Sequence, residues 1–279
     1  MSEKKPLSNL SIRIITAIIG ISILMTLLFK GGEWGIRFFA LLVSVASLVE
    51  FGSMTFRLSD RKLKTYILAV GGLFLSWVHL TFPQALTGGL SFLFVASFLS
   101  YLFAAKDHAA ESSQAHVQEL FASGFGWIYL GILPLYFIDI RLSESGIYWL
   151  ILFLIINWVS DTGAYFAGRF FGKHKLYEKV SPKKTIEGTI GGTLLAVLMG
   201  IAYGQYFFST ISPIKIGTLV LMVSLVAQMG DLCESLLKRS FQVKDSGGLL
   251  PGHGGFLDRF DGAIISAPLM YYWINFILM

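Results

Sequence analysis

The sequence predicts an all-α integral membrane protein with about nine transmembrane helices. Of its 279 residues, 54% are hydrophobic and 14% are charged, whereas an ordinary soluble domain has about a quarter charged residues. The apolar residues form long unbroken runs, without the alternation that marks the strands of a membrane β-barrel. Because lipid offers the backbone no hydrogen bonds, such runs cross a membrane as helices. We expect residues 1–279 to form a single membrane domain.

Nine apolar segments come close to the roughly 20 residues that one helical crossing needs. They centre on Ile12–Phe29, Trp34–Thr55, Tyr66–Phe82, Leu90–Ala105, Phe121–Ile138, Ile147–Phe166, Ile190–Phe208, Ile216–Leu237 and Gly262–Met279. The first segment follows a basic N-terminus in the manner of a signal peptide. We interpret it as a retained span, because no small-x-small cleavage site follows it and many more segments come after it.

The distribution of lysine and arginine indicates the orientation of these spans. With nine spans, 18 of the 22 basic residues fall on the side of the N-terminus, and only Lys30, Arg37, Arg141 and Lys215 fall on the other side. By the positive-inside rule the N-terminus is cytoplasmic and the C-terminus lies on the opposite face. The net charge of +5 sits in loops between apolar spans, which favours membrane lipid over nucleic acid as a partner.

Two cytoplasmic connections are long and rich in glycine and charge, namely residues 168–188 and residues 238–261. Connections usually become long for a functional reason. We therefore expect the chemistry in residues 141–279, and we assign residues 1–140 to spans for packing, dimer contacts and contact with lipid.

Asp231 lies inside the eighth apolar segment, near its cytoplasmic end. An ionisable residue is costly in lipid and usually faces a polar cavity or the interior of the bundle. The spacing of Asp231, Glu234, Ser235 and Lys238 places all four on one helix face, so a polar stripe leads from the membrane to the loop. The alternative is that Asp231 and Lys238 are merely neutralised by neighbours on other helices.

A second acidic pair, Asp258 and Asp261, stands at the mouth of the last span. Carboxylates that two helices offer to one cavity suit a hard divalent cation, since Mg²⁺ is typically held by one or two carboxylates, water and phosphate oxygens. We predict that Asp231, Asp258 and Asp261 bind Mg²⁺, with room for a second cation.

The connection between these acidic residues combines basic side chains with many glycines. Its basic residues are Lys238, Arg239, Lys244 and Arg259, and its glycines are Gly247, Gly248, Gly252, Gly254 and Gly255. Glycines let backbone N–H groups approach a phosphate closely, and basic groups add charge-assisted hydrogen bonds. An ordinary flexible loop with positive-inside charges would account for the lysines, but not for the glycines or the flanking aspartates. The pattern favours phosphate chemistry at the membrane surface.

The remaining candidates of this half are less specific. His253 has a glycine on each side, and we assign it to positioning near phosphates or to proton relay rather than to a metal. No His and Cys residues have zinc-site spacing, and Cys233 is the one cysteine, which excludes an intrachain disulfide. Glu50, near the end of the second segment, is interpreted as a helix-end residue rather than a catalytic one.

Polar residues also surround the first long connection. Asp161 shares a helix face with Asn157, and it could contact a metal or a ribose or serve only in helix packing. Further along, two hydroxyl and two basic residues precede the seventh segment, namely Ser181, Lys183, Lys184 and Thr185. They either bind a triphosphate or mark the positive-inside boundary.

Two stretches carry many of these residues at fixed positions. The first is Ser235-x-Leu237-Lys238-Arg239-x4-Lys244-Asp245-x-Gly247-x2-Leu250-Pro251-x-His253-Gly254-Gly255-Phe256-x-Asp258-Arg259-Phe260-Asp261. The second runs from Ser160-Asp161-Thr162-Gly163-Ala164-Tyr165 through Gly168 and Phe171-Gly172-Lys173 to Ser181-Pro182-Lys183-Lys184-Thr185-x-Glu187-Gly188. Together they resemble the phosphatidate cytidylyltransferase family in its bacterial form. The first 120 residues resemble it only in being hydrophobic spans.

The resemblance implies magnesium-dependent transfer of a cytidylyl group from CTP to phosphatidic acid, by a homodimer in the bacterial cytoplasmic membrane. The expected products are CDP-diacylglycerol and pyrophosphate. Our candidate catalytic residues are Asp231, Asp258, Asp261, Lys238, Lys244 and His253. Our candidate substrate-binding residues are Lys183, Lys184, Arg239, Arg259, Ser181, Thr185 and Asp161.

Two other functions remain open on the sequence. A prenol or dolichol kinase would also use a nucleotide and a basic loop, but it would make a phosphorylated alcohol. An ion-coupled transporter would have polar residues along a path through the membrane and inverted repeats, whereas the charges here cluster on one side. The CDP-alcohol phosphatidyltransferases are disfavoured because their D-G-x2-A-R pattern is absent.

Overall fold

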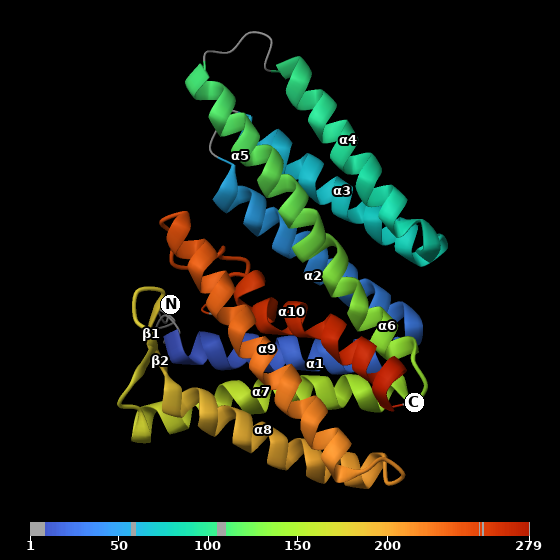
Figure 1. Cartoon of the computed structure of the whole chain (residues 1–279), viewed down its shortest axis with the longest axis vertical. Coiled ribbons are helices and arrows are strands. Elements are labelled where there is room, and N and C mark those ends of the chain that lie inside the picture. The colour runs from blue at the N-terminus through green and yellow to red at the C-terminus, as the bar shows by residue number, and fades with distance from the viewer. Residues whose placement is uncertain (1–8, 57–59, 105–109, 251, 253, 279) are drawn as a thin grey trace, which may run out of the picture.

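The computed structural model describes residues 9–56, 60–104, 110–250, 252 and 254–278. The structure is 83% helical, which confirms the all-α prediction. Figure 1 shows α1, α7 and α8 lying across the view, with α3, α4 and α5 stacked above them. The small β-hairpin lies at the left of this view and the C-terminal end at the right.

The N-terminal half consists of helices. They are α1 (Asn9–Phe29), α2 (Gly32–Thr55), α3 (Arg61–Thr81), η1 (Pro83–Ala85), α4 (Leu86–Ala104), α5 (Ala110–Gly126), the π-helical η3 (Trp127–Ile132), η4 (Leu133–Leu135) and α6 (Tyr136–Leu142).

The C-terminal half contains four long helices and one hairpin. Its elements are α7 (Gly146–Phe171), β1 (Lys175–Tyr177), β2 (Ser181–Thr185), α8 (Ile186–Phe207), α9 (Pro213–Ser240), α10 (Leu257–Trp273) and the π-helical η5 (Ile274–Leu278).

Seven helical stretches of the described residues are long and apolar enough to cross a membrane. Among the described residues, each of the nine predicted segments is mainly helical, but the apolar part of α1, Ile14–Phe29, is shorter than a full span, and α10 has only 17 residues. The predicted count of nine spans is therefore not confirmed. The fifth predicted segment belongs to one stretch, Gln114–Leu142, in which α5 continues through η3 and η4 into α6.

The two long connections are shorter than predicted, because the helices continue past the first charged residues. α7 runs to Phe171, and the chain between α7 and α8 forms an antiparallel hairpin in which Lys175 pairs with Thr185 and Tyr177 with Ser181. α9 runs to Ser240 and α10 begins at Leu257. Hydropathy indicates where the chain leaves the lipid. The helix can continue into water beyond that point, as long as its backbone hydrogen bonds are made.

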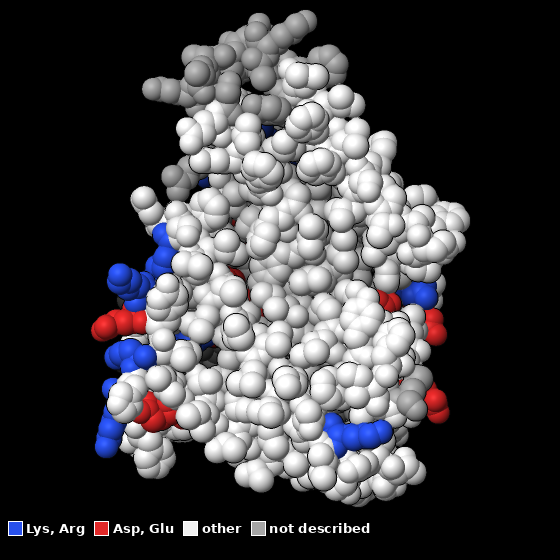
Figure 2. All heavy atoms as spheres, in the orientation of Figure 1, with Lys and Arg blue, Asp and Glu red and all other residues white. Residues whose placement is uncertain are grey.

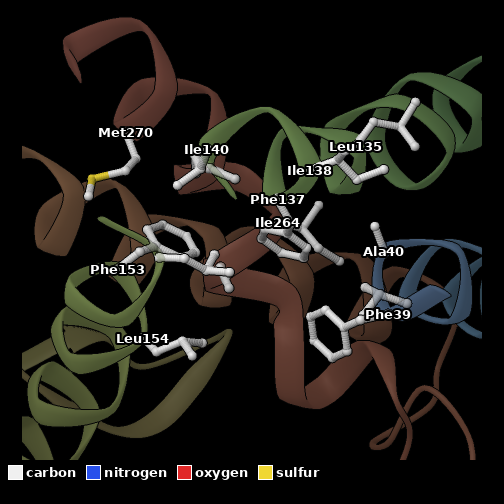
Figure 3. Packing of buried hydrophobic residues seen from close by; sticks show 14 of the residues in the cluster. Phe39, Ala40, Leu135, Phe137, Ile138, Ile140, Phe153, Leu154, Ile264 and Met270 are labelled. Atoms are coloured by element: carbon white, nitrogen blue, oxygen red, sulfur yellow. The ribbon is translucent and has the colours of Figure 1, made fainter. Parts of the chain in front are cut away.

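The two halves share one hydrophobic core. Figure 3 shows side chains of α2, η4, α6, α7 and α10 meeting, among them Phe39, Phe137, Phe153 and Ile264. The Phe39 ring packs edge-on against Phe260 of α10, with their centroids 5.5 Å apart. α2 therefore lies directly beside the helix that carries the second acidic pair.

The outer surface has the character expected for lipid contact. Large apolar side chains are exposed along α3, α4 and α8, for example Trp77, Phe92 and Leu198. In Figure 2 the charged side chains gather at two opposite edges of the face shown, and the area between them is mostly free of charge. A soluble protein does not expose so large an apolar band, so the chain is a membrane protein.

Candidate functional site

The predicted polar stripe on α9 exists. The Lys238 ammonium lies 2.5 Å from the Glu234 carboxylate one turn earlier, and the Ser235 hydroxyl lies 3.5 Å from the Asp231 carboxylate. These contacts place all four residues on one face of a continuous helix. The stripe ends where α9 enters the connection to α10.

Glycines bring α9 and α10 into backbone contact beside the acidic residues. A Cβ atom on Gly230 would lie 3.1 Å from Cα of Gly262, and one on Gly262 would lie 2.7 Å from the carbonyl oxygen of Ala227. Gly230 precedes Asp231 and Gly262 follows Asp261 in the sequence. The close approach of the two helices therefore brings the two carboxylates toward each other.

α7 and α8 make the same kind of contact. A Cβ atom on Gly192 would lie 2.4 Å from the Ser160 carbonyl oxygen, and one on Gly188 would lie 2.8 Å from that of Ala164. Small residues at these spacings let two membrane helices approach closely. Gly163, two residues after Asp161, belongs to this contact, because a Cβ atom there would lie 3.0 Å from Cα of Gly192.

Three aspartates from three helices form the centre of the candidate site. Asp161 of α7 lies within electrostatic reach of Asp231 of α9, and Asp261 of α10 lies within reach of both. Two basic side chains, Lys184 and Arg259, are close enough to Asp161 to interact with it. Asp161, whose role the sequence left open, therefore lies near two of the predicted metal ligands, Asp231 and Asp261.

The predicted metal ligands are not gathered into a ready-made triad. Within the described ranges, no three His, Cys, Asp or Glu side chains converge closely enough to hold a metal ion. Asp231 is occupied by the Lys184 ammonium at 2.5 Å, and Asp258 by that of Lys238 at 2.5 Å. Asp261 accepts a hydrogen bond from the backbone N–H of Gly262. The oxygen donors themselves suit a hard cation.

Asp258 has a second set of contacts, made with the connection. Its Oδ2 accepts hydrogen bonds from the backbone N–H groups of Ser246 at 3.0 Å and Gly255 at 2.8 Å. Asp258 therefore links Ser246 to Gly255 while its other oxygen binds Lys238. Lys238 and Glu234 are thereby linked to the connection through a buried ion pair.

The residues before α8 divide into structural and solvent-facing positions. Thr185 is the N-cap of α8, because its buried hydroxyl accepts a hydrogen bond from the backbone N–H of Gly188 at 3.1 Å. Ser181 takes part in the hairpin, Lys183 is exposed, and Lys184 turns inward to Asp231.

The other basic candidates lie at the edge of the site. Arg239 donates to the backbone carbonyls of Val180 and Val243, and so links the hairpin to the connection. Lys244 and Arg259 have exposed side chains. His253 lies outside the described residues, so its predicted role stays a prediction.

Tyr129 is a functional candidate that the sequence did not indicate. It sits on η3 and is buried, within electrostatic reach of Asp261, Glu234 and Asp231. Its hydroxyl has no hydrogen-bond partner among the described residues. A π-helical turn in an α-helix often marks a functional site, but nothing in the hydrophobic run around Tyr129 distinguishes this residue.

Glu50, predicted as a helix-end residue rather than a catalytic one, contacts the connection beside the site. Its carboxylate is buried and accepts hydrogen bonds from Ser246, Phe256 and Leu257, about 200 residues away in sequence. Its isolation from any compensating charge in the sequence was the signal that could have identified it.

Comparisons with known proteins identify the family of the chain. The model of the cytidylyltransferase family matches residues 11–277. The phosphatidate cytidylyltransferase of Staphylococcus epidermidis strain RP62A is 35% identical over 272 residues, which cover 94% of this chain and 97% of the relative. That of Staphylococcus aureus strain COL is 34% identical over 263 residues, with the same coverage. That of Bacillus subtilis strain 168 is 42% identical over 146 residues, which cover 52% of this chain and 54% of the relative. The chain belongs to the cytidylyltransferase family.

Proposed function

We propose that this chain is a phosphatidate cytidylyltransferase, which converts CTP and phosphatidic acid into CDP-diacylglycerol and pyrophosphate. The observation that carries the proposal is that Asp161, Asp231 and Asp261, from three helices, lie within electrostatic reach of one another, with Lys184 paired to Asp231 and Arg259 within reach of Asp161. Relatives that carry this name match nearly the whole chain. An acidic and basic cluster at this level suits a reaction between a nucleotide and the phosphate group of a lipid.

The proposed reaction is an in-line displacement at phosphorus. A phosphate oxygen of phosphatidic acid attacks the α-phosphorus of CTP, a new P–O bond forms, and the bond to the β-phosphate breaks to release pyrophosphate. The attacking phosphate is anionic at neutral pH, so no covalent enzyme nucleophile is needed. Lys183, Lys184, Arg239, Lys244 and Arg259 are proposed to bind the phosphates, since charge stabilisation and positioning dominate phosphoryl transfer.

We also propose Mg²⁺ as the cofactor. Asp231 and Asp261, with Asp161, offer oxygen donors from three helices, and magnesium needs only one or two protein carboxylates together with water and phosphate oxygens. The bound ion would neutralise charge on the reacting phosphates. The Lys184 ammonium, 2.5 Å from Asp231, would exchange this carboxylate for a phosphate oxygen when the ion binds. Asp258 is proposed to act through Lys238 and the connection.

The proposed setting is a homodimer in the bacterial cytoplasmic membrane, with the hairpin and the 241–256 connection facing the cytoplasm. The excess of lysine and arginine on this side supports the orientation. The acyl chains of phosphatidic acid would enter sideways from the lipid, and the nucleotide would enter from water.

The test is an assay of detergent-purified protein with labelled CTP, phosphatidic acid and Mg²⁺. We expect lipid-soluble label and pyrophosphate in equal amounts, and we expect both to disappear when a chelator is added and to return with excess Mg²⁺. Product formation that persists in the chelator would refute the magnesium proposal alone. Folded protein that forms neither product would refute the proposed function, and phosphorylation of a prenol instead would favour a lipid kinase.

The helix contact beside the aspartates gives a further prediction. Gly262→Ala should reduce kcat roughly 100-fold, because the added methyl group must displace the α9 backbone at Ala227, and a shift of about 1 Å in a catalytic group can cost this much. The measurement is steady-state cytidylyl transfer. Gly124→Ala is the matched control, because a Cβ atom there meets nothing within 4 Å. Equal rates for the two variants would contradict the prediction.

A further inference from the structure

We propose that Glu50 is a positioning residue, which holds the 241–256 connection and the start of α10 in the geometry that the catalytic aspartates require. The kinetic part of this inference rests on the proposed function. The effect of Glu50 on the order of the connection does not depend on that function, and it can be measured separately by hydrogen exchange.

The contacts of Glu50 are made from α2 to a segment at the far end of the sequence. Its Oε1 accepts from the backbone N–H of Phe256 at 2.9 Å. Its Oε2 accepts from the backbone N–H of Leu257 at 2.9 Å and lies 3.0 Å from the Ser246 hydroxyl. The side chain is 4% exposed, so water does not compete for these hydrogen bonds.

The negative charge of Glu50 is compensated by backbone groups. No Lys, Arg or His in the described part of the chain forms an ion pair with it. Phe256 and Leu257 stand at the start of α10, where N–H groups lack partners within the helix and the helix dipole favours an anion. Glu50 thus performs for α10 the task of an N-cap, although it belongs to another helix.

Ser246 connects Glu50 to the proposed catalytic machinery. Its hydroxyl lies 3.0 Å from Oε2 of Glu50 and 3.0 Å from Oδ2 of Asp258, and its N–H donates to Asp258. A serine hydroxyl has one proton, so it donates to one of the two carboxylates at a time. The linkage continues from Asp258 to Lys238 and Glu234. Movement at Glu50 is therefore transmitted to the polar stripe of α9.

Two glycines of the connection fit around Glu50. A Cβ atom on Gly247 would lie 2.5 Å from Oε1 of Glu50, and one on Gly255 would lie 2.0 Å from the Ser246 hydroxyl and 2.6 Å from Oε2 of Glu50. Neither position can carry a side chain while these hydrogen bonds are made. The sequence pattern linked Gly247 and Gly255 to phosphate binding. Their close contacts with Glu50 and Ser246 give a second physical reason for glycine at these positions.

The test compares Glu50→Gln with Ser47→Ala, a buried neighbour one turn earlier on α2 whose hydroxyl has no partner among the described residues. Glutamine keeps the size but turns an N–H₂ group toward backbone N–H donors. We expect amide hydrogen exchange in residues 246–257 to become at least 10-fold faster, and kcat to fall roughly 10- to 100-fold with KM for CTP changed less than threefold. Ser47→Ala should match the wild type in all three measurements.

The outcomes separate this inference from the proposed function. Wild-type exchange and wild-type kcat in Glu50→Gln would overturn it, and so would faster exchange with an unchanged kcat. Faster exchange in a preparation whose wild type transfers no cytidylyl group would support the structural linkage and refute the proposed function. If Glu50→Gln does not fold, Ser246→Ala carries the test. It removes only the hydroxyl link, and it should lower kcat about threefold or more with faster exchange confined to the connection.

Discussion

Asp231→Asn is expected to lower kcat/KM for cytidylyl transfer roughly 10²- to 10³-fold, the loss that follows when one preorganised electrostatic contact to a transition state is removed. Asparagine has nearly the same shape, so the helix and its contacts should remain. The lost charge removes the partner of Lys184 and one of the three carboxylates offered to a cation. The measurement is steady-state kinetics in detergent or nanodiscs, with the Mg²⁺ concentration varied.

The control is Glu33→Gln. Glu33 is an exposed residue in the first turn of α2, paired only with Arg37 on the same helix, and such surface pairs contribute little. Its kinetics should match the wild type. An Asp231→Asn enzyme that is folded and turns over at the wild-type rate would remove Asp231 from the proposed site. A higher Mg²⁺ requirement in this variant would link the loss to cation binding.

The sequence was a good guide to the helices and to the face of α9. Lipid selects apolar residues at many positions at once, so every predicted segment is mainly helical where the structure describes it. The stripe from Asp231 to Lys238 follows from the helical period alone, and the Lys238–Glu234 contact confirms it. Helix ends were less predictable, because neither lipid nor periodicity indicates how far α9 or α7 continues into water.

Pairings between distant segments could not be read from the sequence. Nothing local indicates that Lys184 reaches Asp231, that Asp258 binds Lys238, or that Glu50 reaches residues about 200 positions away. These contacts depend on how the helices cross. Glycines such as Gly262 allow a close crossing, but the sequence does not show which backbone each glycine contacts. The pairings also show that Asp231 is neutralised by Lys184 of the hairpin, and Lys238 by Glu234 of its own helix and Asp258 of α10, which partly matches the alternative interpretation. Neutralisation is compatible with a catalytic role, because the same charges can exchange partners when phosphates bind.

Lys238→Met is expected to be the most destabilising of the changes considered. The Lys238 side chain is 12% exposed and stands between Glu234, whose side chain is 1% exposed, and Asp258, whose side chain is 6% exposed. Among the described residues, removing the cation leaves the Glu234 carboxylate without a partner and Asp258 with only its hydrogen bonds to Ser246 and Gly255, and breaking a buried ion pair in this way costs about 3–5 kcal/mol. We expect a clearly lower thermal unfolding temperature and loss of cytidylyl transfer. Lys215→Met, at the exposed opposite end of α9, is the matched control and should unfold like the wild type.

A double variant distinguishes lost charge compensation from lost packing. Lys238→Met combined with Glu234→Gln removes the carboxylate that is left without a partner, so it should unfold at a higher temperature than Lys238→Met alone. A cycle of the two single variants and the double variant measures this coupling directly. If the double variant is less stable than Lys238→Met, the lysine acts through its aliphatic chain and not through its charge. Recovered stability without recovered activity would indicate that the ammonium group itself is needed at the site, and that Asp258 depends on it to orient the connection.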